Sequence, residues 1–103
     1  MVVRYKIKVH KKVTTEDGRR FDEKTKEKIK RKCKELLSTS PDKVGEQLHG
    51  ELKDYRKLVM FDNYRVVYRI EKSEVLVFIL AVGIRRDSEV YEEAVKRLRH
   101  MTH

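Results

Sequence analysis

The chain has 103 residues, a length that suits one small domain and is too short for two independent hydrophobic cores. Its 26 Lys and Arg residues against 17 Asp and Glu give a formal net charge of +9, which attracts polyanions such as nucleic acids. The charged fraction of 42% is equally compatible with a heavily solvated surface, so total charge alone does not identify a partner.

The composition argues against a secreted, membrane-spanning or metal-dependent protein. A single cysteine, Cys33, excludes an internal disulfide and indicates a reducing, cytoplasmic compartment. The first residues lack a signal-peptide pattern, and the longest apolar run, residues 75–82, is too short to cross a bilayer as a helix. The histidines and Cys33 lack recognised ligand spacings and no glycine-rich phosphate loop is present, so we expect no metal and no cofactor.

The first half of the chain predicts a strand followed by two helices. Residues 3–9 alternate apolar and basic side chains, as a half-buried strand does. Residues 14–41 are helical in composition, and Gly18 is expected to separate a short helix from a long one that Pro41 stops. The long helix carries one apolar stripe, formed by Phe21, Thr25, Ile29, Cys33, Leu36 and Leu37. For its lysine-rich remainder we favour a solvated face with secondary phosphate contacts.

The second half predicts three strands and a final helix. Strands are expected at residues 55–61, 64–70 and 75–83, and the short connections "DN" and "EKSE" indicate an antiparallel meander. The last strand is apolar on both faces, which favours a central place under helices. The order predicts an α+β domain over residues 1–103: an N-terminal strand, a two-helix hairpin, a three-stranded antiparallel meander and a C-terminal helix, forming a four-stranded sheet.

Arginines gather near the end of the last strand, in the segment "GIRRDSEVY". Arginine is permanently charged, and its planar guanidinium offers a fork of donors that suits a phosphate. In the middle strand Arg65, Val67 and Arg69 share one face because side chains alternate. The pattern suits a phosphate-binding site, and simple solvation of the strand residues is the alternative.

The segments "NYRVVYRI", "VGIRR" and "SEVYEEAVKRL" resemble the RelE and ParE superfamily of bacterial and archaeal toxins, especially its RelE branch. The resemblance is close in the C-terminal half and extends to element order in the N-terminal half. It implies the toxin of a type II toxin–antitoxin system: a ribonuclease that cuts messenger RNA in the ribosomal A site without a metal and that a cognate antitoxin silences in a hetero-oligomer. The implied chemistry is attack of the 2′-hydroxyl on the adjacent phosphate, with fixed positive side chains stabilising the transition state.

The resemblance assigns four catalytic residues around one nucleotide-sized cavity. Arg65 falls where the family binds the scissile phosphate, Arg85 where an arginine stabilises the transition state, and Tyr91 where a tyrosine stacks on or orients a nucleotide. Arg56 stands where the best-known members have lysine; arginine is a poor general base, so Arg56 is expected to act as an electrostatic clamp and the base is unassigned. Simple packing of the last helix on the sheet is the alternative for Tyr91.

Further RNA contacts are expected from Lys57, Arg69 and Arg86. In a regular strand Lys57 would point away from the face of Arg56, and only a bulge would turn it into the site. Leu58 stands where the best-known members carry a second basic residue, and Met60 continues the apolar trend. Both could belong to the surface that the antitoxin covers with an apolar and acidic segment.

Two alternatives stay open. A ParE-like inhibitor would bind DNA gyrase without catalysis, and the apolar Leu58 favours it, whereas the combination of Arg65, Arg85 and Tyr91 favours a nuclease. A catalytically weakened basic domain would bind RNA or ribosomes through charge alone.

Overall fold

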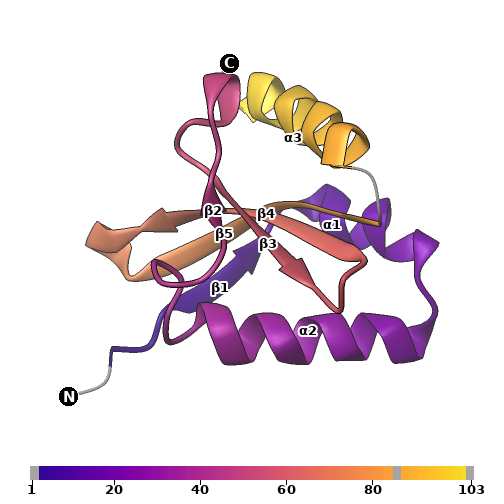
Figure 1. Ribbon diagram of the computed structural model, residues 1–103, viewed down its shortest axis with the longest axis horizontal. Helices are drawn as coiled ribbons and strands as arrows, with labels where there is room; N and C mark the ends of the chain where they lie inside the picture. The colour runs from indigo at the N-terminus through magenta and orange to yellow at the C-terminus, as the bar shows by residue number, and fades with distance from the viewer. Residues whose placement is uncertain (1–2, 85–86, 102–103) are drawn as a thin grey trace.

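In the computed structural model, helices cover both faces of one mixed sheet (Figure 1). The structure describes residues 3–84 and 87–101. Within these residues the strands are β1 Lys6–Val9, β2 Glu46–Gln47, β3 Arg56–Met60, β4 Tyr64–Glu71 and β5 Leu76–Ile84. The helices are α1 Lys11–Thr15, α2 Glu23–Leu37 and α3 Asp87–Met101, with the 3-10 helices η1 Asp17–Arg20, η2 Gly50–Leu52 and η3 Lys72–Glu74. Gly18 lies in η1, between the short and the long helix, as predicted.

The predicted α+β architecture is confirmed, with one addition to the sheet. The described strands run in the order β1-β5-β4-β3-β2. Strands β3, β4 and β5 form the antiparallel meander, and β5 is central because β1 pairs with its other side in parallel. The predicted four-stranded sheet omitted β2, which adds to the outer edge of β3. With two residues, β2 is too short to show an alternating pattern in the sequence.

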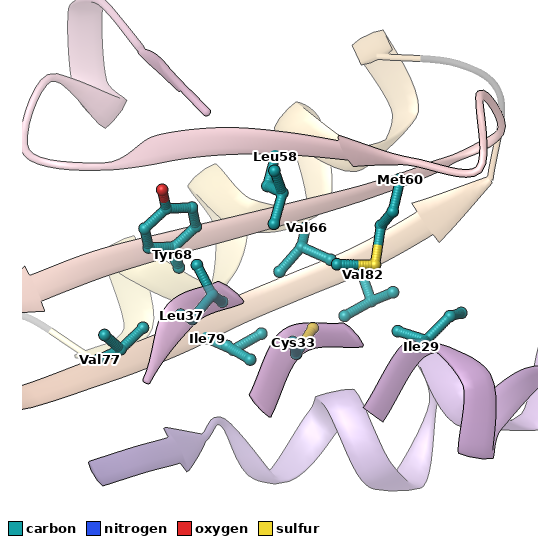
Figure 2. Close-up of a cluster of buried hydrophobic side chains, with 10 residues drawn as sticks. All are labelled: Ile29, Cys33, Leu37, Leu58, Met60, Val66, Tyr68, Val77, Ile79 and Val82. Atoms are coloured by element: carbon teal, nitrogen blue, oxygen red, sulfur yellow. The ribbon is translucent and has the colours of Figure 1, made fainter. Parts of the chain in front are cut away.

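The apolar stripe of the long helix packs α2 against one face of the sheet (Figure 2). From the helix, Ile29, Cys33 and Leu37 are buried. They meet a buried set of strand residues: Leu58, Met60, Val66, Tyr68, Val77, Ile79 and Val82. Burial raises the pKa of the Cys33 thiol to about 12, so at neutral pH Cys33 is a protonated core residue.

Helix α3 covers the opposite face of the sheet, where a second buried cluster includes Val67, Leu80, Ala81 and Val90. The register between β4 and β5 shifts at Val67, so the adjacent Leu80 and Ala81 both join this cluster. Gly83 lets the helix approach the strand, because a Cβ at this position would lie 2.1 Å from Cγ2 of Val90. The glycine of "GIRR" is therefore explained by close packing of α3 on β5.

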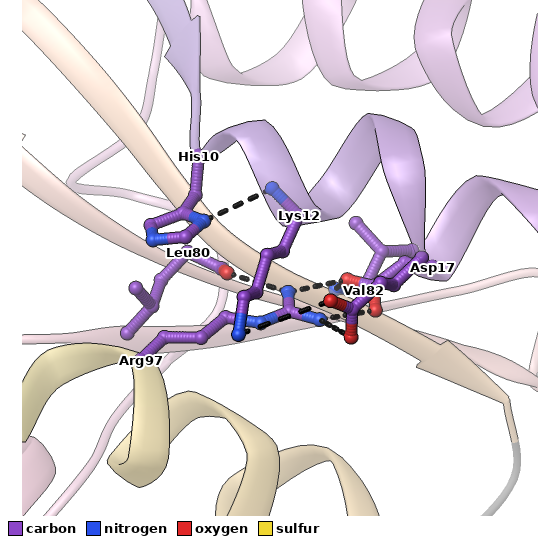
Figure 3. Close-up of polar contacts among 7 residues, drawn as sticks. His10, Lys12, Asp17, Leu80, Val82 and Arg97 are labelled. Atoms are coloured by element: carbon purple, nitrogen blue, oxygen red, sulfur yellow. Dashed lines mark hydrogen bonds and ion pairs between the residues drawn. The ribbon is translucent and has the colours of Figure 1, made fainter. Parts of the chain in front are cut away.

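A buried ion pair joins α3 to η1, near the end of β1, and both of its members also hydrogen-bond to β5 (Figure 3). Arg97 donates from Nη1 and Nη2 to the Asp17 carboxylate, both at 2.7 Å, and from Nη1 to the Leu80 carbonyl at 3.0 Å. The same carboxylate accepts the backbone N–H of Val82 at 2.9 Å. Arg97 is 1% exposed and Asp17 is 4% exposed. The pair thus satisfies two backbone groups of β5 inside the protein.

Candidate functional site

The turn between β3 and β4 decides which side chains of β3 face α3. Met60 pairs with Tyr64, so the loop holds residues 61–63, and Phe61 and Asp62 take left-handed φ values of 52° and 61°. The two-residue turn "DN" expected from the sequence would have paired Phe61 with Tyr64. One additional loop residue reverses which alternate residues of β3 share a face with Arg65.

Lys57, and not Arg56, therefore lies on the face of Arg65. Lys57 is opposite Val67, and Val59 is opposite Arg65, and paired residues point to the same side of a sheet. Val67 belongs to the cluster under α3, which identifies that side. The register along β3 is regular, so Lys57 reaches this side without the bulge considered above. The prediction that Arg56 shares a cavity with Arg65 is wrong.

Arg56 instead holds the connection between α2 and β2. Its Nε and Nη2 donate to the Val44 carbonyl at 3.3 Å and 3.1 Å, and Nη2 also donates to the Gly45 carbonyl at 3.0 Å. The Tyr68 hydroxyl lies 2.9 Å from the same Val44 oxygen. Arg56 therefore fixes the backbone immediately before β2.

Leu58 and Met60 face the core under α2, where they are 7% and 4% exposed. The suggestion that they form an antitoxin-binding surface is wrong. Their apolar character is explained by burial, because a basic side chain at either position would enter the core.

Lys57 approaches Tyr91 from the sheet. The Lys57 ammonium lies 5.9 Å from the centre of the Tyr91 ring, within the range of a cation–π contact. Tyr91 is half-buried in α3 and packs against the cluster beneath that helix. Arg65, also half-buried, is a diagonal neighbour of Lys57 across the β3–β4 pair, a relation that corresponds to about 7–8 Å. An ammonium, a guanidinium and a phenol therefore share the α3 side of the sheet.

A carboxylate stands beside Lys57. Glu46 of β2 pairs with Lys57 across the ladder, and its Oε2 lies 3.8 Å from Lys57 Nζ. The Lys57 side chain is 15% exposed, whereas the Glu46 side chain is 79% exposed. Sequence reasoning missed Glu46 because it missed β2, and a glutamate in a polar connector gives no signal of its own.

Arg69 has partners inside the protein. Its guanidinium lies 5.5 Å from the Tyr55 ring centre and 5.4 Å from that of Phe78, and Nη1 donates to the Tyr55 hydroxyl at 3.1 Å. Its Nε also forms an ion pair with Glu71 at 2.5 Å. Burial raises the pKa of Tyr55, so the phenol is protonated at neutral pH and accepts this hydrogen bond as a neutral group. These contacts hold the Arg69 guanidinium against Tyr55, Phe78 and Glu71.

The other two predicted site residues, Arg85 and Arg86, lie outside the described residues. They follow Ile84, the last residue of β5, and Gly83 of that strand pairs with Arg65. Within residues 3–84 and 87–101, His, Cys, Asp and Glu side chains form no group that could hold a metal ion. In the same part of the chain, no helix has the length and apolar character needed to cross a membrane.

The sequence and the fold match those of a known class of toxin. Residues 4–89 match the family described as the ParE toxin of the type II toxin–antitoxin system parDE. The chain belongs to the RelE/ParE superfamily of type II toxins, and the relatives that follow place it in the RelE branch.

The mRNA interferase toxin RelE of Escherichia coli (strain K12) is 37% identical over 82 residues, which cover 80% of this chain and 85% of the relative. The mRNA interferase RelE of Shigella flexneri shows the same values. The RelBE2 toxin–antitoxin complex of Mycobacterium tuberculosis matches with a TM-score of 0.75 and 25% identity over 84% of this chain and 98% of that chain. The isolated E. coli RelE toxin matches with a TM-score of 0.62 and 30% identity, over 91% of this chain and 98% of that chain. The predicted family and fold are confirmed.

Proposed function

We propose that this protein is the toxin of a type II toxin–antitoxin system and acts as a ribosome-dependent endoribonuclease on messenger RNA. Its E. coli and Shigella relatives are mRNA interferases, and 37% identity over most of both chains supports the same activity. The observation that carries the proposal is the shared position of Lys57, Arg65 and Tyr91 on the α3 side of the sheet. Two cations and an aromatic ring on one face of the sheet suit a phosphate and its adjoining base.

Each side chain has a separate task in this proposal. Arg65 binds the scissile phosphate through its fork of donors, and Lys57 adds a point charge. Tyr91 stacks on or orients a nucleotide next to that charge. Arg85 stabilises the transition state and Arg86 contacts the RNA backbone. Attack of the 2′-hydroxyl, without a metal, yields a 2′,3′-cyclic phosphate and a free 5′-hydroxyl.

Primer-extension mapping of messenger RNA in a purified translation system tests this function. We expect new 5′ ends in ribosome-bound message, and none in the same RNA without ribosomes. The cuts should persist with a chelator of transition metals while the Mg²⁺ that ribosomes need is retained. Intact message together with blocked gyrase supercoiling would favour the ParE-like alternative. Ribosome binding without cleavage would favour the weakened basic domain.

The proposed activity also sets the compartment and the partners. Ribosomes and messenger RNA place the protein in the cytoplasm. Solved relatives include the RelBE2 complex of M. tuberculosis and the intact RelBE toxin–antitoxin complex of E. coli, which support a hetero-oligomer with a cognate antitoxin.

A groove between β1 and α2 suits an antitoxin segment. Its volume is about 1190 Å³, and its lining includes the apolar Ile7, Val13 and Phe21. The charged residues that line it are six basic and three acidic side chains: Arg4, Lys6, Lys26, Lys30, Arg31 and Lys34 against Glu23, Glu27 and Glu35. An amphipathic segment with an acidic edge complements an apolar floor and a basic rim. We infer that such a segment of the antitoxin docks here, on the sheet face opposite to Lys57.

Reversing two rim charges, Lys30→Glu with Lys34→Glu, is expected to weaken antitoxin binding about tenfold or more while leaving messenger RNA cleavage unchanged. Both lysines are exposed on α2, on the opposite face from the candidate site. Isothermal titration with the cognate antitoxin measures the loss. The matched control, Lys24→Glu with Lys43→Glu, changes the net charge equally at exposed positions outside the groove. Equal losses in both pairs would contradict docking in the groove.

A further inference from the structure

We propose that Glu46 is the general base that takes the proton from the attacking 2′-hydroxyl, an inference that rests on the proposed ribonuclease function. The chemistry needs such a group, and the arginines cannot supply it because a guanidinium does not lose its proton in proteins. Carboxylates are common general bases, and an accessible one suits a substrate that arrives from solution. Glu46 is 79% exposed in its side chain and contacts a cation of the site.

The β2–β3 ladder puts the carboxylate where the substrate must lie. Glu46 and Lys57 are directly paired, so both side chains point to the α3 side. Glu46 Oε2 is 3.8 Å from Lys57 Nζ, and that nitrogen is 5.9 Å from the centre of the Tyr91 ring. A phosphate bound to Lys57 therefore brings its neighbouring 2′-oxygen towards the carboxylate.

The residues on both sides of Glu46 are anchored, Gly45 through its backbone and Gln47 through its side chain. Before it, Gly45 has a φ of 74°, its carbonyl accepts from Arg56 Nη2 at 3.0 Å, and a Cβ there would lie 2.6 Å from the Lys57 carbonyl. After it, Gln47 Nε2 donates to the Tyr55 carbonyl at 3.0 Å. Such support holds a reacting group in position. Arg56 therefore has a positioning role, because it holds the Gly45 carbonyl immediately before Glu46.

The proton balance of the step is complete without a cofactor. The Glu46 carboxylate accepts the 2′-hydroxyl proton as the 2′-oxygen bonds to phosphorus. The bond between phosphorus and the 5′-oxygen breaks, the 5′-oxygen takes a proton from water, and Glu46 returns its proton to solvent. Lys57 transfers no proton in this step and lies beside both the carboxylate and the phosphate.

The competing explanation is that Glu46 only neutralises Lys57. An exposed ion pair contributes little to stability, so both explanations predict a folded variant. They differ in the rate and the affinity: loss of a base lowers the rate of the chemical step, whereas loss of a counter-ion strengthens phosphate binding and leaves that rate intact.

Glu46→Gln separates the two, because glutamine keeps the shape and removes the base. With saturating toxin on programmed ribosomes, we expect the single-turnover cleavage rate to fall about 10²–10⁴-fold at unchanged or tighter ribosome binding. Glu46→Asp should keep part of the rate, and formate in solution should restore part of it to Glu46→Ala. Glu74→Gln is the matched control, since Glu74 is exposed in η3 at the turn between β4 and β5.

A wild-type cleavage rate for Glu46→Gln, with or without tighter binding, would overturn the assignment and leave the ribonuclease function standing. A wild-type protein that produces no cuts in the same assay would overturn the proposed function, and the role of Glu46 with it. Thermal unfolding followed by circular dichroism should show the same midpoint for all the Glu46 variants and the wild type.

Discussion

Replacing Arg97 with methionine is expected to lower the free energy of unfolding by about 3–5 kcal/mol, because it leaves a buried charge without its partner. Methionine retains much of the apolar stem, but the Asp17 carboxylate, 4% exposed, loses both donors at 2.7 Å. The Leu80 carbonyl loses its donor at 3.0 Å as well. A domain of this size has a total stability of about 5–15 kcal/mol, so a large part of it would be lost.

The contribution that the Arg97 charge itself makes to stability should not depend on pH near neutrality. Burial acts to lower the pKa of Arg97, but the hydrogen bonds and the charge of Asp17 outweigh burial and raise that pKa above its ordinary value. A raised pKa stabilises the fold at every pH below the unfolded-state value, and for arginine that value is far above neutral. The guanidinium therefore stays charged in both states during the measurement.

Urea unfolding followed by circular dichroism measures the loss, and Lys96→Met is the matched control on the exposed side of α3. The double variant Asp17→Leu with Arg97→Met should be more stable than the sum of the single losses implies, because neither charge is then left alone. Equal stabilities of Arg97→Met and Lys96→Met would show that the pair does not hold α3 in place.

Hydrophobic periodicity was sufficient to predict most of the elements. Ile29, Cys33 and Leu37 recur at the helical spacing and are buried together under the sheet. The continuous apolar run of β5 predicted a central strand, and β5 lies between β1 and β4. These predictions succeeded because burial of one face constrains every residue of a long element.

The faces of β3 could not be predicted in this way, because they depend on one residue of loop length. Phe61 is apolar and aromatic, so the sequence pattern predicts that it belongs to the strand. It lies instead in the loop, with a left-handed φ of 52°, and is 39% exposed. Turn propensities favour glycine, asparagine or aspartate in that conformation. The misplaced turn exchanged the positions of Arg56 and Lys57 relative to Arg65.

Contacts between distant segments also left no local signal. Asp17 and Arg97 are 80 residues apart and were indistinguishable from solvated charges, because charged residues are seldom buried unless they are paired. Glu46 meets Lys57 only after the chain has turned through η2 and entered β3. Both contacts require the fold before they can be recognised.

Lys57→Ala is expected to reduce the cleavage rate on ribosomes about 10²–10³-fold, the scale for removing one electrostatic group from a transition state. The reason is its position: the ammonium lies 5.9 Å from the Tyr91 ring centre and 3.8 Å from Glu46 Oε2, on the face of Arg65. Lys57→Arg should keep much of the rate because it keeps the charge. Single-turnover primer extension measures each rate.

The neighbouring residue supplies the decisive comparison. Arg56→Lys should lower the rate much less than Lys57→Ala, because Arg56 acts on the backbone of Val44 and Gly45 and lysine can still donate to those carbonyls. The Arg56→Lys variant should also unfold at a lower temperature than the wild type, whereas the Lys57→Ala variant should unfold near the wild-type temperature. If Arg56→Lys abolished cleavage while Lys57→Ala cleaved normally, the catalytic face would have to be the one that packs on α2. The burial of Leu58 and Met60 on that face, at 7% and 4% exposure, leaves no room there for a nucleotide.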